Sequence, residues 1–250
     1  MNAAVAELWR FPVKSFQGER VDTLELRAGG AVGDRVLAVV DPAAGKVLSA
    51  KRYSDLLMAS AYTADGEVVV VLPDDQEFAA GDDRVHDALS DWLGKHVRLE
   101  VPPTDAVYPM EMYTGMSDES TPLFDWGGPP GTWLDLADAH FLTTASLRAA
   151  AALHPDGDWD VRRFRPYALI DTDEEGFVEE TWSTFALGAV EAKVMMPTMR
   201  CSMPSRAQPG IERDMEIGTT IRDGNNNNLG VYCSITQPGT VAVGDAVVPR

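Results

Sequence analysis

The chain has 250 residues, enough for one large domain or two small ones, and its 45% hydrophobic and 24% charged residues exclude a disordered or fibrous protein. Acidic residues outnumber basic ones 39 to 21, and the net charge of −18 disfavours a nucleic acid or an anionic membrane surface as a partner, because both are negative themselves. Two cysteines are too few for a disulfide framework, and neither a leader pattern nor a run of about 18 apolar residues is found, so we expect a cytoplasmic protein.

Short β-rich runs separated by turn residues dominate the first hundred positions. They predict strands at 5–13, 21–26, 35–40 and 68–72. The run at 68–72 is continuously apolar, which is typical of a strand buried on both faces. Apolar residues at helical spacing predict a helix at 84–93, and the acidic residues around it indicate a solvated face in preference to a docking patch for a basic partner.

The pattern weakens between 102 and 131, where proline and glycine clusters indicate loops and a boundary between two lobes. We therefore expect domains at 1–110 and 111–250. A helix is predicted from Thr143 to Leu153, ending before Pro155, and strands are predicted at 167–170, 186–195, 230–236 and 240–248. The fold class is a β-rich α+β fold with a β-barrel-like second lobe and a smaller β-rich N-terminal domain.

Several common reaction motifs are missing from the chain. No dinucleotide-binding glycine fingerprint, phosphate-binding lysine loop or hydrolase nucleophile elbow is present, and the four histidines are scattered. The acidic stretch that contains Glu174, Glu175, Glu179 and Glu180 is expected to be solvated.

The few basic residues are the informative ones in so acidic a chain. They stand at Lys14, Arg35, Arg162, Arg163, Arg165 and Arg200. Guanidinium groups grip phosphate with two hydrogen bonds, so these residues are candidates for anion binding, and salt bridges to the abundant acids are the alternative. Pro166 forces Arg165 out of the α region, and the helix start near Thr143 offers free backbone N–H groups as an anion cradle.

The two cysteines have different surroundings. Cys233 alternates with apolar residues on one strand face and is expected to be buried as a small hydrophobe. Cys201 lies in an irregular segment between prolines and beside Arg200, where a reactive or metal-binding thiolate is expected to be exposed. One thiolate cannot form a closed zinc site, so Cys201 is either a nucleophile or a ligand to a metal brought by a cofactor.

Eight short motifs now point to one family. They are Phe11-Pro12-Val13-Lys14-Ser15, Gly33-Asp34-Arg35, residues 142–147, Arg163-Phe164-Arg165-Pro166, Arg200-Cys201, and residues 229–232, 237–240 and 243–245. Each is weak alone, but in this order the chain resembles the MOSC proteins (molybdenum cofactor sulfurase C-terminal type) over nearly its whole length, including their N-terminal domain. It is similar to the amidoxime-reducing members of the family.

The resemblance implies a β-barrel domain packed with a smaller N-terminal domain, and a molybdenum cofactor, a metal-binding pyranopterin, held between them. By motif, the residues implied to line the pterin and its phosphate are Lys14, Ser15, Arg35, Thr143, Ser146, Arg165, Arg200 and Tyr232. Cys201 corresponds to the cysteine that ligates molybdenum, and it is also the implied catalytic residue. A soft thiolate and a basic pocket suit a metal that is already bound by dithiolene sulfurs.

The chain departs from the family at Tyr167, where an asparagine usually follows the Phe-Arg-Pro motif; the larger side chain either narrows the pocket or turns into the core. Because the chain lacks the cysteines of an iron–sulfur cluster, electrons must come from a separate protein, either ferredoxin-like or a b-type cytochrome with a flavin reductase. The implied function is reduction of N-hydroxylated small molecules. Two alternatives stay open: a sulfur carrier that accepts a persulfide on Cys201 from a pyridoxal-phosphate-dependent cysteine desulfurase, and a binding module without redox chemistry.

Overall fold

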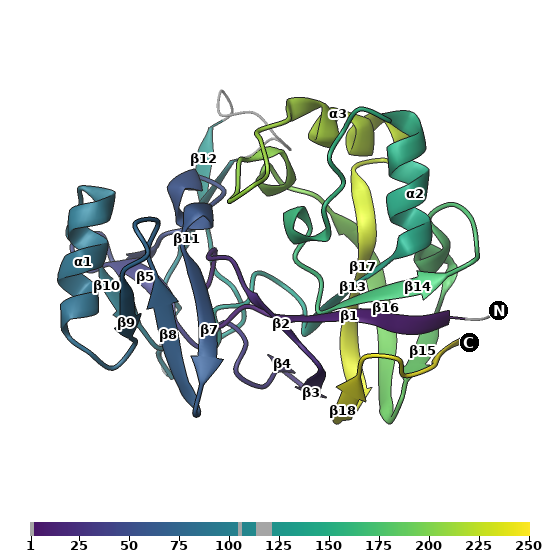
Figure 1. Cartoon of the computed structure of the whole chain (residues 1–250), viewed down its shortest axis with the longest axis horizontal. Coiled ribbons are helices and arrows are strands. Elements are labelled where there is room, and N and C mark those ends of the chain that lie inside the picture. Colours follow the sequence, from purple (N-terminus) through teal and green to yellow (C-terminus); the bar gives the residue numbers. More distant parts are fainter. Residues whose placement is uncertain (1–2, 105–106, 114–121) are drawn as a thin grey trace.

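The computed structural model of the protein describes residues 3–104, 107–113 and 122–250, and strands dominate this part of the chain (Figure 1). The largest sheet has eight strands in the order β19-β15-β16-β17-β13-β14-β1-β2. These strands are β1 (Ala3–Arg10), β2 (Glu19–Val21), β13 (Ala139–Thr143), β14 (Ala168–Thr172), β15 (Thr184–Leu187), β16 (Val190–Met199), β17 (Asn228–Gln237) and β19 (Val247–Pro249). The sheet curls into a half-barrel, because the N–H of Val5 donates to the carbonyl of Asp245 at 2.9 Å and joins β1 to the segment before β19.

The interior of the half-barrel is apolar because its strands alternate inward-facing and outward-facing side chains. Leu8, Phe141, Phe185 and Val231 are all less than 2% exposed in this core. Cys233 is completely buried beside them, which confirms the prediction for this cysteine. Burial raises the pKa of the Cys233 thiol, so this sulfur is a packing group.

Two helices cover the outer face of the half-barrel (Figure 1). The first, α2 (Thr144–Leu153), confirms the predicted helix, and the Thr143 hydroxyl caps it by accepting the N–H of Ser146 at 3.1 Å. The second, α3 (Met215–Gly224), was not predicted. Its Ile217 and Ile221 are buried one turn apart against the same core as α2.

The other lobe carries two further sheets and α1 (Arg84–Leu93), which confirms the other predicted helix. One sheet has the order β10-β5-β6-β11-β12, and the other has the order β7-β8-β9. These strands are β5 (Ala38–Asp41), β6 (Lys46–Val47), β7 (Ser60–Ala64), β8 (Glu67–Val71), β9 (Glu77–Ala79), β10 (Arg98–Glu100), β11 (Met110–Tyr113) and β12 (Leu123–Trp126).

Two expectations for this lobe were wrong. The residues between 102 and 131, expected to be loops, contain β11 and β12. The apolar run at 68–72 is not buried on both faces: only Val70 and Leu72 are buried, because the sheet of β7, β8 and β9 packs against the core with one face.

Strand pairing ties the two lobes together. Strands β1 and β2, from the start of the chain, belong to the half-barrel, while β3 (Thr23–Arg27) pairs with β4 (Gly30–Ala31) and with β18 (Gly239–Ala242) from near its end. The pairing therefore crosses the boundary that we place at 110. None of α1, α2 and α3, with ten residues each, has the length and apolar character to cross a membrane.

Candidate functional site

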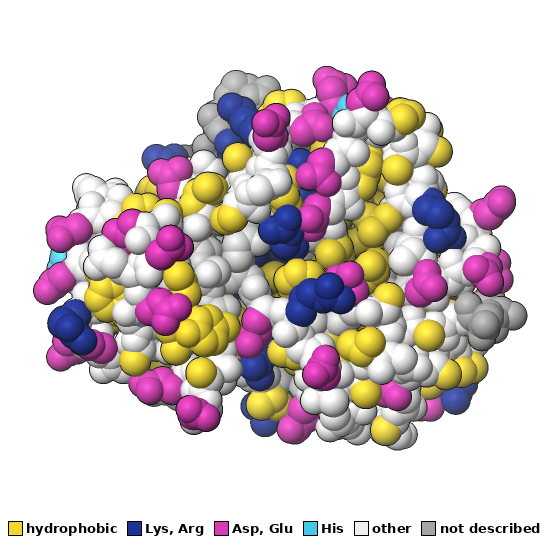
Figure 2. Space-filling view, in the orientation of Figure 1, with side chains coloured by type: hydrophobic (Ala, Val, Ile, Leu, Met, Phe, Trp, Pro, Cys, Tyr) yellow, Lys and Arg dark blue, Asp and Glu magenta, His cyan; other side chains and the backbone are white. Residues whose placement is uncertain are grey.

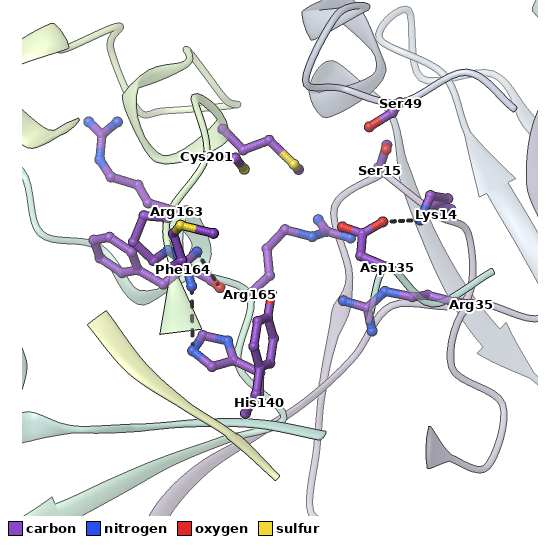
Figure 3. A pocket seen from close by; sticks show the side chains of 14 residues that line it. Lys14, Ser15, Arg35, Ser49, Asp135, His140, Arg163, Phe164, Arg165 and Cys201 are labelled. Atoms are coloured by element: carbon purple, nitrogen blue, oxygen red, sulfur yellow. Dashed lines mark hydrogen bonds and ion pairs between the residues drawn. The ribbon is translucent and has the colours of Figure 1, made fainter. Parts of the chain in front are cut away.

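A cleft with about 620 Å³ of empty space, partly open to solvent, lies where the two lobes meet. Seven of the nine predicted site residues line it: Lys14, Ser15, Arg35, Arg165, Arg200, Cys201 and Tyr232. Figure 3 shows Cys201 on one side of the cleft and Ser15 and Ser49 on the other, with Arg165 reaching between them. The cleft thus unites residues that are up to 218 positions apart, from Lys14 to Tyr232.

The N-terminal side of the cleft is built by the turn that follows β1. Pro12 cannot continue the strand ladder, and the turn is completed by Ser15, which has a positive φ of 71°. The Ser15 hydroxyl accepts the N–H of Ala50 at 3.0 Å, which holds this turn against the segment before Lys51. Both lysines, Lys14 and Lys51, are about 5% exposed, so two cations are buried beside this turn.

A single carboxylate from the segment before β13 pairs with both of these cations. Asp135 accepts the Lys14 ammonium at 2.6 Å with Oδ1 and the Lys51 ammonium at 2.9 Å with Oδ2, and the Lys14 ammonium also donates to the carbonyl of Trp133 at 2.6 Å. Burial, with the charges of Lys51 and Arg35, lowers the pKa of Lys14 to about 8. Burial acts to raise the pKa of Asp135, but the two ammonium groups hold it well below its usual range. Asp135 therefore remains ionised and bridges the two lobes.

Arg35 is held beside a second carboxylate. It has a positive φ of 45°, its guanidinium donates to Asp34, and it lies 5.5 Å from the centre of the Phe11 ring. Burial acts to lower the pKa of Arg35, but Asp34, Tyr167 and Asp135 together leave the pKa raised.

The structure places Tyr167 in the core under this pair. Its side chain is 2% exposed, and its hydroxyl donates to Asp34 at 2.7 Å. Tyr167 lines a second cavity, which adjoins the cleft and shares Arg35, Asp135 and Arg165 with it. The tyrosine therefore fixes Asp34 and leaves the main cleft open.

Arg165 has no hydrogen bond to a carboxylate among the described residues, although Asp34 and Asp135 are nearby. Its φ of 57° lies in the left-handed region and not in the extended region that we expected for a residue before proline. The guanidinium lies 4.1 Å from the centre of the Phe11 ring, and Nη1 donates to the carbonyl of Phe16 at 2.5 Å. Nη2 is buried without a hydrogen-bond partner among the described residues. Burial and the nearby Arg35 lower the pKa of Arg165 to about 9. Because Nη2 is a buried donor, an acceptor on a bound ligand would satisfy it.

Arg200 lies on the opposite wall, at the end of β16. It donates to the carbonyl of Phe164 at 3.0 Å, and its Nη1 lies 3.4 Å from Nε2 of His140. Burial and the Arg200 charge lower the pKa of His140 well below its usual range, so this imidazole is neutral and accepts from the guanidinium. The His140 ring also packs edge-on against Tyr232, with the ring centres 5.7 Å apart. These contacts fix the direction in which Arg200 points.

Cys201 follows Arg200 at the cleft and is half-buried, so the expectation of an exposed thiol was wrong. The Cys201 side chain packs against the core of the N-terminal lobe, as does Met203 after it. Arg163 anchors the following segment, because its guanidinium donates to the carbonyls of Pro204 and Glu212 at 2.9 Å each. The thiol is therefore held in place from both lobes.

Thr143 and Ser146 are not brought to the cleft, which corrects the two remaining predictions. Both are completely buried, and their hydroxyls donate to Glu179 at 2.7 and 2.6 Å. Glu179, which we expected to be solvated, is itself completely buried, and burial raises the pKa of its carboxyl group. The expected anion-binding position at the start of α2 exists, but the carboxyl group of Glu179 occupies it.

Four polar residues at or beside the cleft were missed in the sequence: Ser49, Lys51, Asp135 and His140. Lys51 and Asp135 belong to none of the motifs, and only the rarity of lysine in so acidic a chain singles out Lys51. Within the residues that the structure describes, no three His, Cys, Asp or Glu side chains form a metal site.

Comparisons with known proteins agree with this architecture. The model of the MOSC domain matches residues 135–248, and that of the MOSC N-terminal beta barrel domain matches residues 2–96. Mitochondrial amidoxime-reducing component 1 of Danio rerio is 26% identical over 170 residues, which are 64% of this chain and 51% of that protein. Mitochondrial amidoxime reducing component 2 of Macaca fascicularis is 23% identical over 281 aligned residues, covering 97% of this chain and 82% of that protein.

The chain thus spans about half the length of the first of these relatives and most of the second. Among solved structures, the YuaD protein from Bacillus subtilis has the same fold, with a TM-score of 0.51 at 10% identity over 99% of this chain and 94% of that one.

Proposed function

Because the chain belongs to the MOSC domain family, we propose that its cleft holds a molybdenum cofactor and that the protein reduces N-hydroxylated small molecules, with Cys201 as a ligand of the metal. The relatives named amidoxime-reducing components support the choice of reaction class. The observation that carries the proposal is the buried Arg165 Nη2, which has no hydrogen-bond partner among the described residues and lines the same cleft as Cys201.

The charges of the cleft fit an anionic cofactor. The cations at or beside it are Lys14, Arg35, Lys51, Arg163, Arg165 and Arg200, and among the described residues only Asp34 and Asp135 are hydrogen-bonded to them as carboxylates. Four unit charges are therefore left over in a chain of net charge −18. A phosphate accepts hydrogen bonds from guanidinium groups at short distance, so Arg165 is the residue that we expect to donate to it.

The donor set of the cleft also fits molybdenum that arrives already bound to a pterin. Soft thiolates suit a metal held by dithiolene sulfurs, and Cys201 offers one free sulfur ligand at a fixed position. When bound, the cofactor would supply the redox chemistry that splits the N–O bond. The overall reaction consumes two electrons and two protons and converts R–NH–OH to R–NH₂ and water.

The residues of this chain have distinct tasks in the proposal. Arg165 and Arg200 bind the cofactor, and Asp135 keeps Lys14 and Lys51 charged and in place beside it. The neutral His140 keeps the Arg200 guanidinium oriented. Electrons come from a separate carrier protein, which makes the carrier a required partner.

Metal and pterin analysis tests this proposal. The chain is produced in a host that assembles the cofactor, and molybdenum and pterin are measured per chain in the parent protein, in Cys201→Ser and in the matched control Cys233→Ala. We expect one molybdenum per chain in the parent and in the control, and a loss of at least tenfold in Cys201→Ser. Sulfane sulfur on Cys201 without molybdenum would show a sulfur carrier instead, and neither group would show a binding module. Either result refutes the proposal.

A further inference from the structure

A groove on the N-terminal lobe lies between the turn from β8 to β9 and the C-terminal half of α1. Its apolar surface comes from Leu72, Pro73, Ala88 and Trp92. It has about 880 Å³ of empty space, partly open to solvent, and is separate from the cleft. Ala88 and Trp92 lie four residues apart on α1, so the helix turns one continuous face toward the groove.

The rim of this groove is acidic. Asp74 and Asp91 line it, and Asp87 lies one helical turn before Asp91. None of the three forms an ion pair with another described residue, whereas Asp82, nearby, is paired with Arg84. Acidic side chains are also numerous on the lobe that carries α1 (Figure 2). The groove therefore combines an apolar floor with uncompensated negative charge.

The floor of the groove is connected to the cleft through one aromatic contact. The Trp92 ring packs edge-on against Phe16, with the ring centres 6.2 Å apart. The carbonyl of Phe16 accepts the Arg165 guanidinium, and Ser15, the residue before Phe16, lines the cleft. The groove and the cleft are thus linked by the contact of Trp92 with the Phe16 ring and of Arg165 with the Phe16 carbonyl.

From these three observations we propose that the groove is the docking site of the electron carrier, and that the carrier is a small protein with a basic face and an apolar side chain that enters the groove. The identity of the partner rests on the proposed function. The carrier is the electron donor: a carrier that gives up one electron per encounter docks twice for each N–O bond that is reduced. Charge complementarity raises the rate of encounter, and the apolar contact selects the groove over other acidic surfaces.

A small basic c-type cytochrome in its oxidised form serves as the probe, and its binding to the full chain is followed by titration at 10 mM and 150 mM salt. The test variant carries Asp74→Asn, Asp87→Asn and Asp91→Asn. The matched control carries Asp156→Asn, Asp173→Asn and Glu175→Gln on the other lobe, an equal change of charge. We expect the test variant to weaken binding at least tenfold at 10 mM salt and the control less than threefold. The difference should shrink at 150 mM, where the Debye length falls from about 30 to about 8 Å.

A second pair of variants separates docking in the groove from attraction by charge alone. Ala88→Gln and Ala88→Glu both place a larger side chain in the groove, and the second also adds a negative charge. Docking in the groove predicts weaker binding of the probe to both, in proteins whose thermal unfolding matches the parent.

Three results would overturn the proposal: tighter binding to Ala88→Glu, equal weakening by the two triple variants, or no binding of the probe to the parent. Binding is measured without turnover. Failure to find molybdenum would therefore count against the proposed function and leave the docking result intact.

Discussion

Removing the charge of Asp135 is expected to destabilise the junction of the two lobes. In Asp135→Asn the ammonium groups of Lys14 and Lys51 lose the carboxylate that they share. Breaking a fully buried ion pair costs about 3–5 kcal/mol. Because the Asp135 side chain is 37% exposed, solvent screens part of this interaction, and we expect a loss of about 2–3 kcal/mol in the free energy of unfolding at pH 7.

Urea unfolding measures this loss, and Asp125→Asn is the matched control. Asp125 pairs with Lys46 at 2.8 Å, but its side chain is 51% exposed, so its loss should cost less than about 1 kcal/mol. Adding Lys14→Met to Asp135→Asn should recover part of the loss, because one of the two stranded charges is then gone. A loss below 1 kcal/mol in Asp135→Asn, or a further loss in the double variant, would refute the reasoning.

Three more predictions concern single residues. Arg165→Met should lower pterin retention tenfold or more, because a hydrogen bond to a charged group contributes about 1.5–3 kcal/mol. The same variant should change the unfolding free energy of the cofactor-free protein by less than about 1 kcal/mol. Pterin retention equal to that of the parent protein would contradict this prediction. Burial lowers the pKa of Lys14 to about 8, so the native state releases this proton at a lower pH than the unfolded state does. The free energy of unfolding should therefore rise by about 1.4 kcal/mol per pH unit between pH 8 and 10. In urea titrations, Lys14→Met should remove that rise. Cys233→Ser should lose about 1–3 kcal/mol of unfolding free energy, because it buries an unpaired hydroxyl. Cys201→Ser should lose less, because Cys201 is only half-buried. Equal losses in thermal melts would argue against separate roles for the two cysteines.

Helices and strands with strong local signals could be predicted from the sequence. The apolar spacing within 84–93 and the proline after Leu153 gave two helices with the correct ends. Helix α3 has a weaker signal, because two glycines and two threonines lower its helix propensity. Its capping residue Asp214 and the buried pair Ile217 and Ile221 were the available clues.

The candidate site was predictable where a residue belongs to a motif that the fold brings to the cleft. Sequence alone could not show that Glu179 reaches the start of α2 from 36 residues away and takes the place of an external anion beside Thr143. Nor could it show that the Arg163 guanidinium donates to backbone carbonyls, whereas Nη2 of Arg165 has no hydrogen-bond partner among the described residues. These differences depend on which chain segments meet in space, and spacing along the sequence does not record that.

The pairing of β1 with β14 also fixes the order in which this protein can fold during synthesis. Leu8 leaves the ribosome early, but its partner Ala168 follows about 160 residues later. At about 5–20 residues per second, β1 waits roughly 10–30 s with an unsatisfied, apolar strand edge. Such an edge is prone to pair with other chains, so the interval is one in which a chaperone would protect the nascent protein. The same strand that joins the lobes in the native state makes the newly made chain vulnerable to aggregation.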